Sequence, residues 1–221
     1  RGSGAMSPLR DLFLAPRATE ARAAPRVRSR VHADARAPTL GVLAPARDLP
    51  AIAAAAGLVV GRRAPAALVC LHARGAPPAP AALRAPPRAA ATRLVASLGA
   101  RGVQAEGRGR LVVAVLPDDP DEAAIAATRA HAAAGALPAV LGLAARHHDL
   151  DGLLSAQDAI LLALPPAVDP TLADLALRGA EALVPSAAAV TLARDPLTRT
   201  LALAGVCAPR AIRVAVEGVL A

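Results

Sequence analysis

Residues Leu111 to Ala144, LVVAVLPDDPDEAAIAATRAHAAAGALPAVLGLA, carry the clearest indication of the fold. This stretch opens with one apolar run, Leu111–Leu116, and closes with another, Leu137–Ala144. Runs that are apolar on both faces are typical of strands buried beneath helices on both sides of a sheet. Between them, Asp119-Pro120 places a capping carboxylate before a proline suited to the first turn of a helix. The stretch therefore predicts a strand, a helix and a second, parallel strand.

The same pattern continues on both sides of this stretch. Four further apolar runs predict buried strands, and Ala- and Leu-rich segments with helical spacing lie between them: Thr39–Ala44, Ala67–His72, Asp158–Leu164 and Ala188–Ala193. Asp169-Pro170 and Asp195-Pro196 repeat the signal for a helix start. Strands that alternate with helices favour parallel pairing and right-handed crossovers. The predicted fold class is α/β, with a three-layer, doubly wound, mostly parallel sheet of the Rossmann-like kind.

Composition narrows the possible chemistry. The chain has 221 residues, 55% of them hydrophobic, so it is long enough to bury one core and too apolar to be disordered. It contains no lysine, tyrosine or tryptophan, so all 25 cationic side chains are arginines. A Schiff-base lysine, a lysine general base and a tyrosine acid are therefore excluded. The two cysteines stand far apart in apolar runs and are expected to be reduced and buried, which together with the lack of a membrane-spanning stretch predicts a cytoplasmic protein.

The chain is expected to divide into three segments. Residues 39–221 are predicted to form a single α/β domain, and residues 7–38 a basic N-terminal extension. Arg1-Gly2-Ser3-Gly4-Ala5 resembles a cloning remnant, so residues 1–6 are expected to be such a scar. At the other end, apolar residues alternate with charged ones over 212–217, which favours a half-exposed edge strand that could pair with another chain.

The N-terminal extension holds two candidate interaction features. Residues 7–14 carry apolar side chains at helical spacing, which could dock in a partner's groove or pack on their own domain. Further along, arginines alternate with smaller residues and would form a cationic face, which could bind anions or nucleic acid. Because aromatic stacking platforms are absent, such nucleic-acid binding would be nonspecific and sensitive to salt. The candidate partner-binding residues are Leu9, Leu12, Phe13, Arg26, Arg28 and Arg30.

The loop after Thr39–Ala44 bears on nucleotide binding, because ligands of doubly wound sheets bind beyond the carboxyl ends of the strands. This loop reads Pro45-Ala46-Arg47-Asp48-Leu49-Pro50 and contains no glycine, lysine, serine or threonine. A phosphate-binding loop needs glycines whose N–H groups cradle the anion, a lysine for the phosphates and a hydroxyl for Mg²⁺. We therefore predict no working phosphate loop, no catalytic residue and no cofactor.

Acidic residues and histidines follow two of the predicted strands. If Leu111–Leu116 and Leu137–Ala144 are neighbours, their loops could converge on a metal ion and activate water, as in a metal-dependent hydrolase. The alternative, which we favour, is that the acids offset a helix dipole and the histidines lie on a solvated loop. The metal-ligand candidates are Asp118, Asp119, His147, His148, Asp149 and Asp151.

Cys70 and His72 are the remaining pair of chemically capable side chains. Alternate positions of a strand share a face, so a nucleophile and a base would lie side by side. No third group that would orient the histidine can be identified from the sequence. A buried cysteine beside a histidine at the end of a strand is therefore the favoured interpretation.

Read in order, several of these segments resemble the ParA/MinD-like branch of the P-loop ATPases. Thr39–Ala44 and the apolar helix Ala51–Ala56 occupy the places of that family's first strand and following helix, and Ala67–His72 that of its second strand. Gln157–Pro165, in which an aspartate precedes an apolar run and a proline, is similar to a late strand of the family, and the helix Thr171–Leu183 follows it.

The resemblance implies a degenerate member without the Walker A motif, in effect a pseudo-ATPase. Relatives of that kind act by dimerising and recruiting partners. The resulting hypothesis is a non-catalytic, homodimeric scaffold or adaptor that recruits protein partners in pilus, secretion or division machinery. No ATP-site residue is carried over from the family.

Overall fold

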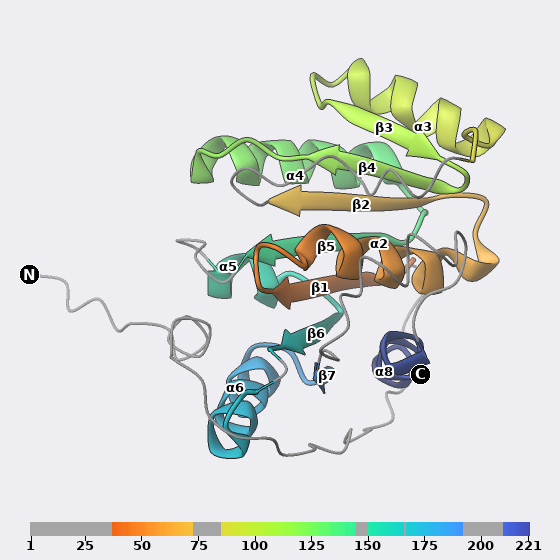
Figure 1. The fold of residues 1–221 in the computed structure, drawn as a ribbon. Coiled ribbons are helices and arrows are strands. Elements are labelled where there is room, and N and C mark those ends of the chain that lie inside the picture. Colours follow the sequence, from red (N-terminus) through yellow and green to blue (C-terminus); the bar gives the residue numbers. More distant parts are fainter. Residues whose placement is uncertain (1–36, 73–84, 145–149, 166, 192–209) are drawn as a thin grey trace, which may run out of the picture.

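The computed structural model describes residues 37–72, 85–144, 150–165, 167–191 and 210–221. In these residues seven strands form one sheet in the order β3-β4-β2-β5-β1-β6-β7 (Figure 1). All neighbouring strands are parallel except β3 and β4, which are antiparallel. The strands are β1 Thr39–Ala44, β2 Ala67–His72, β3 Ala105–Arg108, β4 Leu111–Val115, β5 Ala139–Ala144, β6 Ala159–Leu164 and β7 Ala187–Thr191. The predicted α/β class with a mostly parallel sheet is confirmed.

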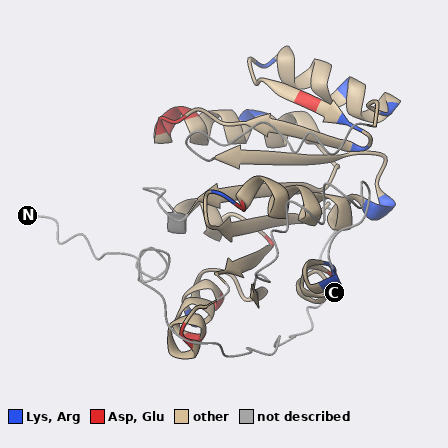
Figure 2. Cartoon of the chain, viewed as in Figure 1, with Lys and Arg blue, Asp and Glu red and all other residues tan. Residues whose placement is uncertain are grey.

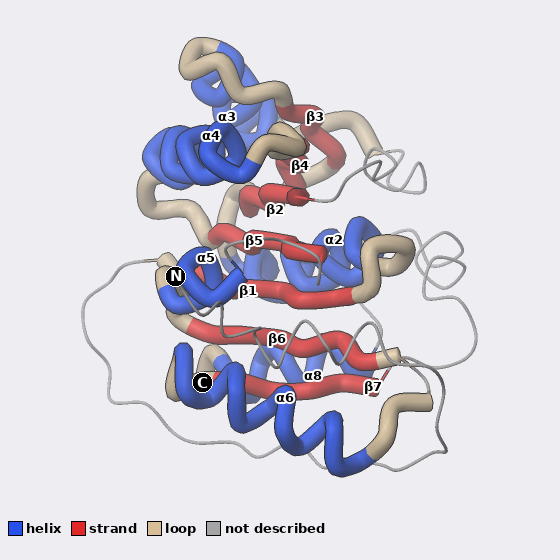
Figure 3. Tube along the Cα trace, turned by 90° about the vertical axis from the view of Figure 1, so that its left-hand side faces the viewer, coloured by secondary structure: helices blue, strands red, loops and turns tan. Residues whose placement is uncertain are grey.

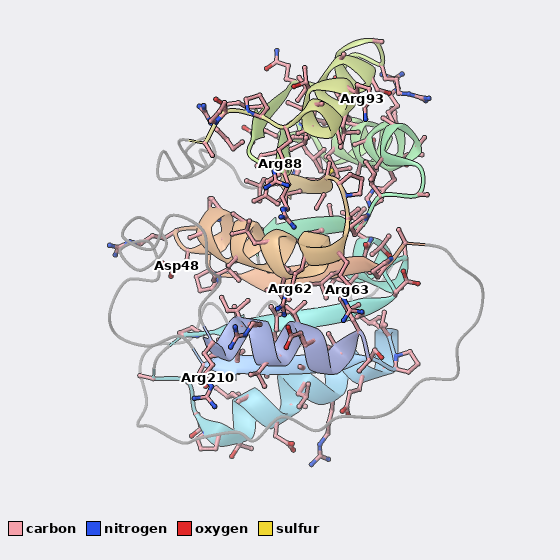
Figure 4. All side chains as sticks on the ribbon, turned by 90° about the vertical axis from the view of Figure 1, so that its right-hand side faces the viewer. Asp48, Arg62, Arg63, Arg88, Arg93 and Arg210 are labelled. Carbon is pink, nitrogen blue, oxygen red and sulfur yellow. The ribbon has the colours of Figure 1, made fainter. Side chains whose placement is uncertain are left out.

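Helices cover both faces of the sheet. α2 (Leu49–Val60), which continues into the 3-10 turn η1 (Gly61–Arg63), and α8 (Arg210–Val219) lie on one face (Figure 4). On the other face lie α3 (Ala89–Gly99), α4 (Pro120–Ala134), α5 (Leu150–Ser155) and α6 (Pro170–Leu183) (Figure 3). No helix among the described residues is long and apolar enough to cross a membrane.

Successive residues of a strand pack alternately into two hydrophobic cores, one on each face of the sheet. In β1, for example, Leu40 and Val42 pack in the core beneath α2 and α8, whereas Leu43 packs in the core beneath α4 and α6. Because both faces are covered, β1, β2 and β6 are buried at every position. This double burial is the physical reason why these strands have uninterrupted apolar sequences.

The predicted helix starts at Asp119 and Asp169 are confirmed. The Asp119 carboxylate accepts hydrogen bonds from the backbone N–H groups of Asp121 and Glu122, at 3.1 and 3.0 Å. The Asp169 carboxylate likewise accepts from the N–H groups two and three residues on, at 2.8 and 3.3 Å. The third predicted start, Asp195-Pro196, lies outside the described residues.

Two elements differ in kind from their sequence-based predictions, and several strands differ in their bounds, as does β5, which begins at Ala139 and not at Leu137. The predicted edge strand over residues 212–217 is wrong, because this segment belongs to helix α8, whose buried side chains Ile212, Ala215 and Val216 recur at helical spacing. Strand β3 was not predicted, since Ala-Glu-Gly-Arg carries no apolar pattern. Strand β7 begins at Ala187, one residue before the predicted run.

Hydrogen bonds between Thr39 and Asp158 join the start of β1 to the start of β6, and we call this pair the polar clamp. The Asp158 carboxylate accepts from the Thr39 N–H at 2.8 Å and from the Thr39 hydroxyl at 2.9 Å. In return, the Asp158 N–H lies 3.1 Å from the Thr39 hydroxyl oxygen and 3.0 Å from the Thr39 carbonyl oxygen. Thr39 is 7% exposed, so the clamp satisfies polar groups that would otherwise be buried without partners.

Candidate functional site

The connection between β1 and α2 stands where a doubly wound sheet would bind a ligand. Only four residues, 45–48, join the strand to the helix. The N–H groups of Asp48 and Leu49 both donate to the Pro45 carbonyl oxygen, at 2.9 and 3.0 Å, and the N–H of Ile52 donates to the Asp48 carbonyl oxygen. Pro50 has no N–H group to offer. Three of the first four helical positions therefore have no N–H group available to an anion.

Packing also closes the beginning of α2. Leu49 and every following residue to Gly57 are buried, and α2 is apolar on all sides. Helix starts bind phosphates by pointing free N–H groups at them in an open, glycine-lined turn. The β1–α2 connection contains no glycine, and the N–H groups of Asp48, Leu49 and Ile52 are already bonded within the chain.

His72 ends β2 and lies beside the segment that follows β4. The two strands are paired, and the Leu116 N–H donates to the Leu71 carbonyl oxygen at 2.8 Å. His72 is 9% exposed. Burial lowers the pKa of His72 from its usual value near 6.5, while the Asp118 carboxylate and the backbone at Pro117 and Asp118 partly oppose that shift. Strand order thus brings an aspartate to the histidine, which the sequence alone did not reveal.

Cys70 does not complete a catalytic pair with this histidine. Its thiol is fully buried, and burial raises its pKa to about 12. The thiolate, which is the nucleophilic form, is therefore scarcely populated near neutral pH. The structure supports the interpretation of Cys70 as a small core residue.

The state of His72 leads to a prediction about pH. A histidine whose pKa is lowered by folding is protonated more readily in the unfolded chain, so the stability it contributes is present above pH 6.5. That contribution is lost as the pH falls from 6.5 towards the lowered pKa of the folded state. We expect the free energy of unfolding, measured with urea at pH 7.5 and 5.5, to fall more for the natural chain than for His72→Gln. Equal losses in both proteins would contradict the prediction.

The acidic and histidine residues proposed as metal ligands are only partly described. Asp118 and Asp119 lie at the start of α4, where Asp119 caps the helix. The predicted metal site required β4 and β5 to be neighbours, so that the loops after them would converge. Strand β2 lies between β4 and β5, so these loops do not follow neighbouring strands. Residues 147–149 and the side chain of Asp151 lie outside the described part of the chain, and within that part no three such residues are grouped to hold a metal ion. The metal site therefore stays the untested alternative to the roles in helix capping and on a solvated loop that we favour.

The predicted partner-binding residues of the extension lie outside the described residues as well. These are Leu9, Leu12, Phe13, Arg26, Arg28 and Arg30. The structure instead describes exposed arginines on adjoining segments, among them Arg62 and Arg63 at the end of α2 and Arg88 at the start of α3, which are labelled in Figure 4. The sequence did not single them out because they are far apart along the chain.

Comparisons with known proteins identify a distant similarity in structure and none in sequence. No protein-family model matches the chain, and no curated protein is detectably similar to it in sequence. The crystal structure of a ParA family ATPase from Chlorobium tepidum TLS is similar, with a TM-score of 0.49 and 13% sequence identity. That similarity covers 85% of this chain and 99% of the ATPase chain. A similarity this slight says nothing of activity, ligands or partners.

Proposed function

We propose that this protein is a non-catalytic, ParA/MinD-like scaffold that self-associates and recruits protein partners. The observation that carries the proposal is the β1–α2 connection. The N–H groups of Asp48 and Leu49 are bonded to the Pro45 carbonyl oxygen, residue 50 is a proline, the helix start is buried, and no lysine exists in the chain. An α/β sheet with this connection lacks the means to hold a triphosphate, which leaves its surfaces for other macromolecules.

The ParA/MinD-like part of the proposal rests on the segments in which the sequence resembles that family. Each of those segments is a strand or helix of the expected type, in the expected chain order: β1, α2, β2, β6 and α6. The aspartate that precedes the late strand, Asp158, has a structural role, since it clamps β6 to β1. Because the sequence resembles that family, we propose that the partners come from pilus, secretion or division machinery.

Nucleotide binding tests the proposal directly. We expect isothermal titration of the purified chain with ATP and Mg²⁺ to show no saturable heat, and phosphate release to stay at the rate of the buffer. Arg47 is the one cation in the β1–α2 connection, so Arg47→Ala serves as a matched control and is expected to behave identically. Saturable binding that Arg47→Ala weakens, or turnover of ATP, would overturn the proposal.

A further inference from the structure

Five arginines lie on three neighbouring segments, at the end of α2 and η1, at the start of α3 and in the β3–β4 hairpin. Hydrogen bonds hold these segments together: the Arg110 guanidinium donates to the carbonyl oxygens of Arg62 at 2.7 Å and Gly61 at 3.3 Å. The N–H of Arg88 donates to the carbonyl oxygen of Gly109 in the hairpin at 2.6 Å. We call this group the arginine cluster; its members are Arg62, Arg63, Arg88, Arg108 and Arg110.

Local structure accounts for only part of the arginine cluster. Arg108 pairs with Glu106, and Arg62 lies 3.4 Å from Glu217. Arg110 binds carbonyl groups at the end of α2 and η1, where the helix dipole favours a cation. Arg63 and Arg88 are exposed and form no ion pair with any other described residue.

Arg88 in particular has no local electrostatic reason for its position. It is the N-cap residue of α3, makes no side-chain capping bond, and places a positive charge at the positive end of the helix dipole. The α3 helix would be better served by an uncharged or acidic residue at that position. A partner that supplies negative charge would account for it.

The chain itself carries such a negative surface at the opposite end of β4. We call it the acidic turn; it comprises Asp118, Asp119, Asp121 and Glu122 around the start of α4. β4 begins directly after Arg110 and ends three residues before Asp118, so the strand separates the two charged groups. Figure 2 shows acidic residues at the start of α4 and basic residues at the opposite ends of the strands. Asp121 and Glu122 form no ion pair with a described residue.

We propose that copies of this chain associate head to tail, with the arginine cluster of one copy docked on the acidic turn of the next. The inference rests on the self-association in the proposed function and names its surface. Guanidinium groups suit this contact because they bind carboxylates through two parallel hydrogen bonds. The two surfaces differ, so each added copy leaves one of each exposed, and the assembly grows unless it closes into a ring.

An interface built from exposed charges is sensitive to salt. Such charges are screened over about 10 Å at 0.1 M ionic strength and over about 3 Å at 1 M. By light scattering at low ionic strength, we therefore expect the full chain to have a weight-average mass above its 22.0 kDa monomer mass. At high ionic strength the mass is expected to fall to that of the monomer.

A charge swap tests the surface. The full-length variants Arg63→Glu/Arg88→Glu and Asp121→Arg/Glu122→Arg are each expected to be monomeric at low salt. Their equimolar mixture is expected to associate again, since each variant then offers the charge that the other needs. Arg101→Glu/Arg129→Glu changes the net charge as much as Arg63→Glu/Arg88→Glu does, but outside the arginine cluster. This control variant is expected to associate as the natural chain does. Asp121→Asn/Glu122→Gln, which leaves no cation at the helix start, is expected to be monomeric too.

The outcomes separate this inference from the proposed function. A natural chain that stays monomeric at low salt would remove both the docking surface and the self-association of the proposed function. A natural chain that associates while the three variants of the proposed surfaces associate equally well would overturn the docking surface alone. The same holds if the mixture fails to restore association between folded variants, with folding checked by circular dichroism.

Discussion

Asp158→Ala is expected to lower the free energy of unfolding by about 3 kcal/mol, since hydrogen bonds to a charged group each contribute about 1.5–3 kcal/mol. The substitution removes the acceptor of both the N–H and the hydroxyl of Thr39, at 2.8 and 2.9 Å. Thr39 is 7% exposed, so water cannot fully replace the lost partner. Urea unfolding followed by far-ultraviolet circular dichroism measures the change.

Two further variants show whether the clamp, and not loss of a surface charge, causes the effect. Asp158→Asn keeps one side-chain oxygen as an acceptor and is expected to lose roughly half as much stability. Asp174→Ala removes an exposed aspartate that pairs with Arg178 one helical turn away, at 2.5 Å. Exposed pairs of this kind contribute about 0.5 kcal/mol or less, so Asp174→Ala is expected to be nearly neutral. A loss in Asp158→Ala no larger than in Asp174→Ala would show that the clamp does not stabilise the sheet.

The sequence predicted most of the sheet because its central strands are buried on both faces. β1, β2 and β6 have no solvent-facing positions, so their apolar runs are uninterrupted and their bounds can be read within a residue. The helix starts at Asp119 and Asp169 were predictable for a similar local reason, because the capping contact joins residues only two or three positions apart.

Elements whose formation depends on distant contacts were not predictable. β3 is a four-residue edge strand that exists because β4 pairs with it and α3 covers it, and its own sequence carries no strand signal. In α8, Ile212 and Val216 fit both a two-residue and a helical period, and packing against α2 and β7 selects the helix.

For the candidate site too, features that depend on one short segment were predictable, and features that depend on distant contacts were not. The prediction that no phosphate loop is present follows from the residues of one short connection, and the structure adds that the N–H groups of Asp48 and Leu49 are already bonded. The approach of Asp118 to His72 and the gathering of five arginines both depend on strand order. Strand order is set by the packing of the entire sheet and cannot be read from any single segment.

Gly61→Ala is expected to destabilise the fold by about 2 kcal/mol, within the range for overpacked cores. Gly61 stands where α2 passes into η1, and its φ of −79° suits any residue, so the cost comes from space alone. A β-carbon at Gly61 would lie 2.6 Å from the β-carbon of Ala67. That atom cannot rotate away, and the Ala67 N–H is bonded to the Arg110 carbonyl oxygen at 2.9 Å, which fixes the start of β2.

Gly99→Ala is the matched control, because it adds the same methyl group at the end of a helix where nothing lies within 4 Å. This variant is expected to be neutral or more stable by up to about 1 kcal/mol, since alanine restricts the unfolded chain and favours helix. The two midpoints of urea unfolding should therefore shift in opposite directions, or only that of Gly61→Ala should move. Equal stability of Gly61→Ala and Gly99→Ala would mean that α2 can move away from β2. The segments that carry the arginine cluster would then not be held in a fixed arrangement for a partner.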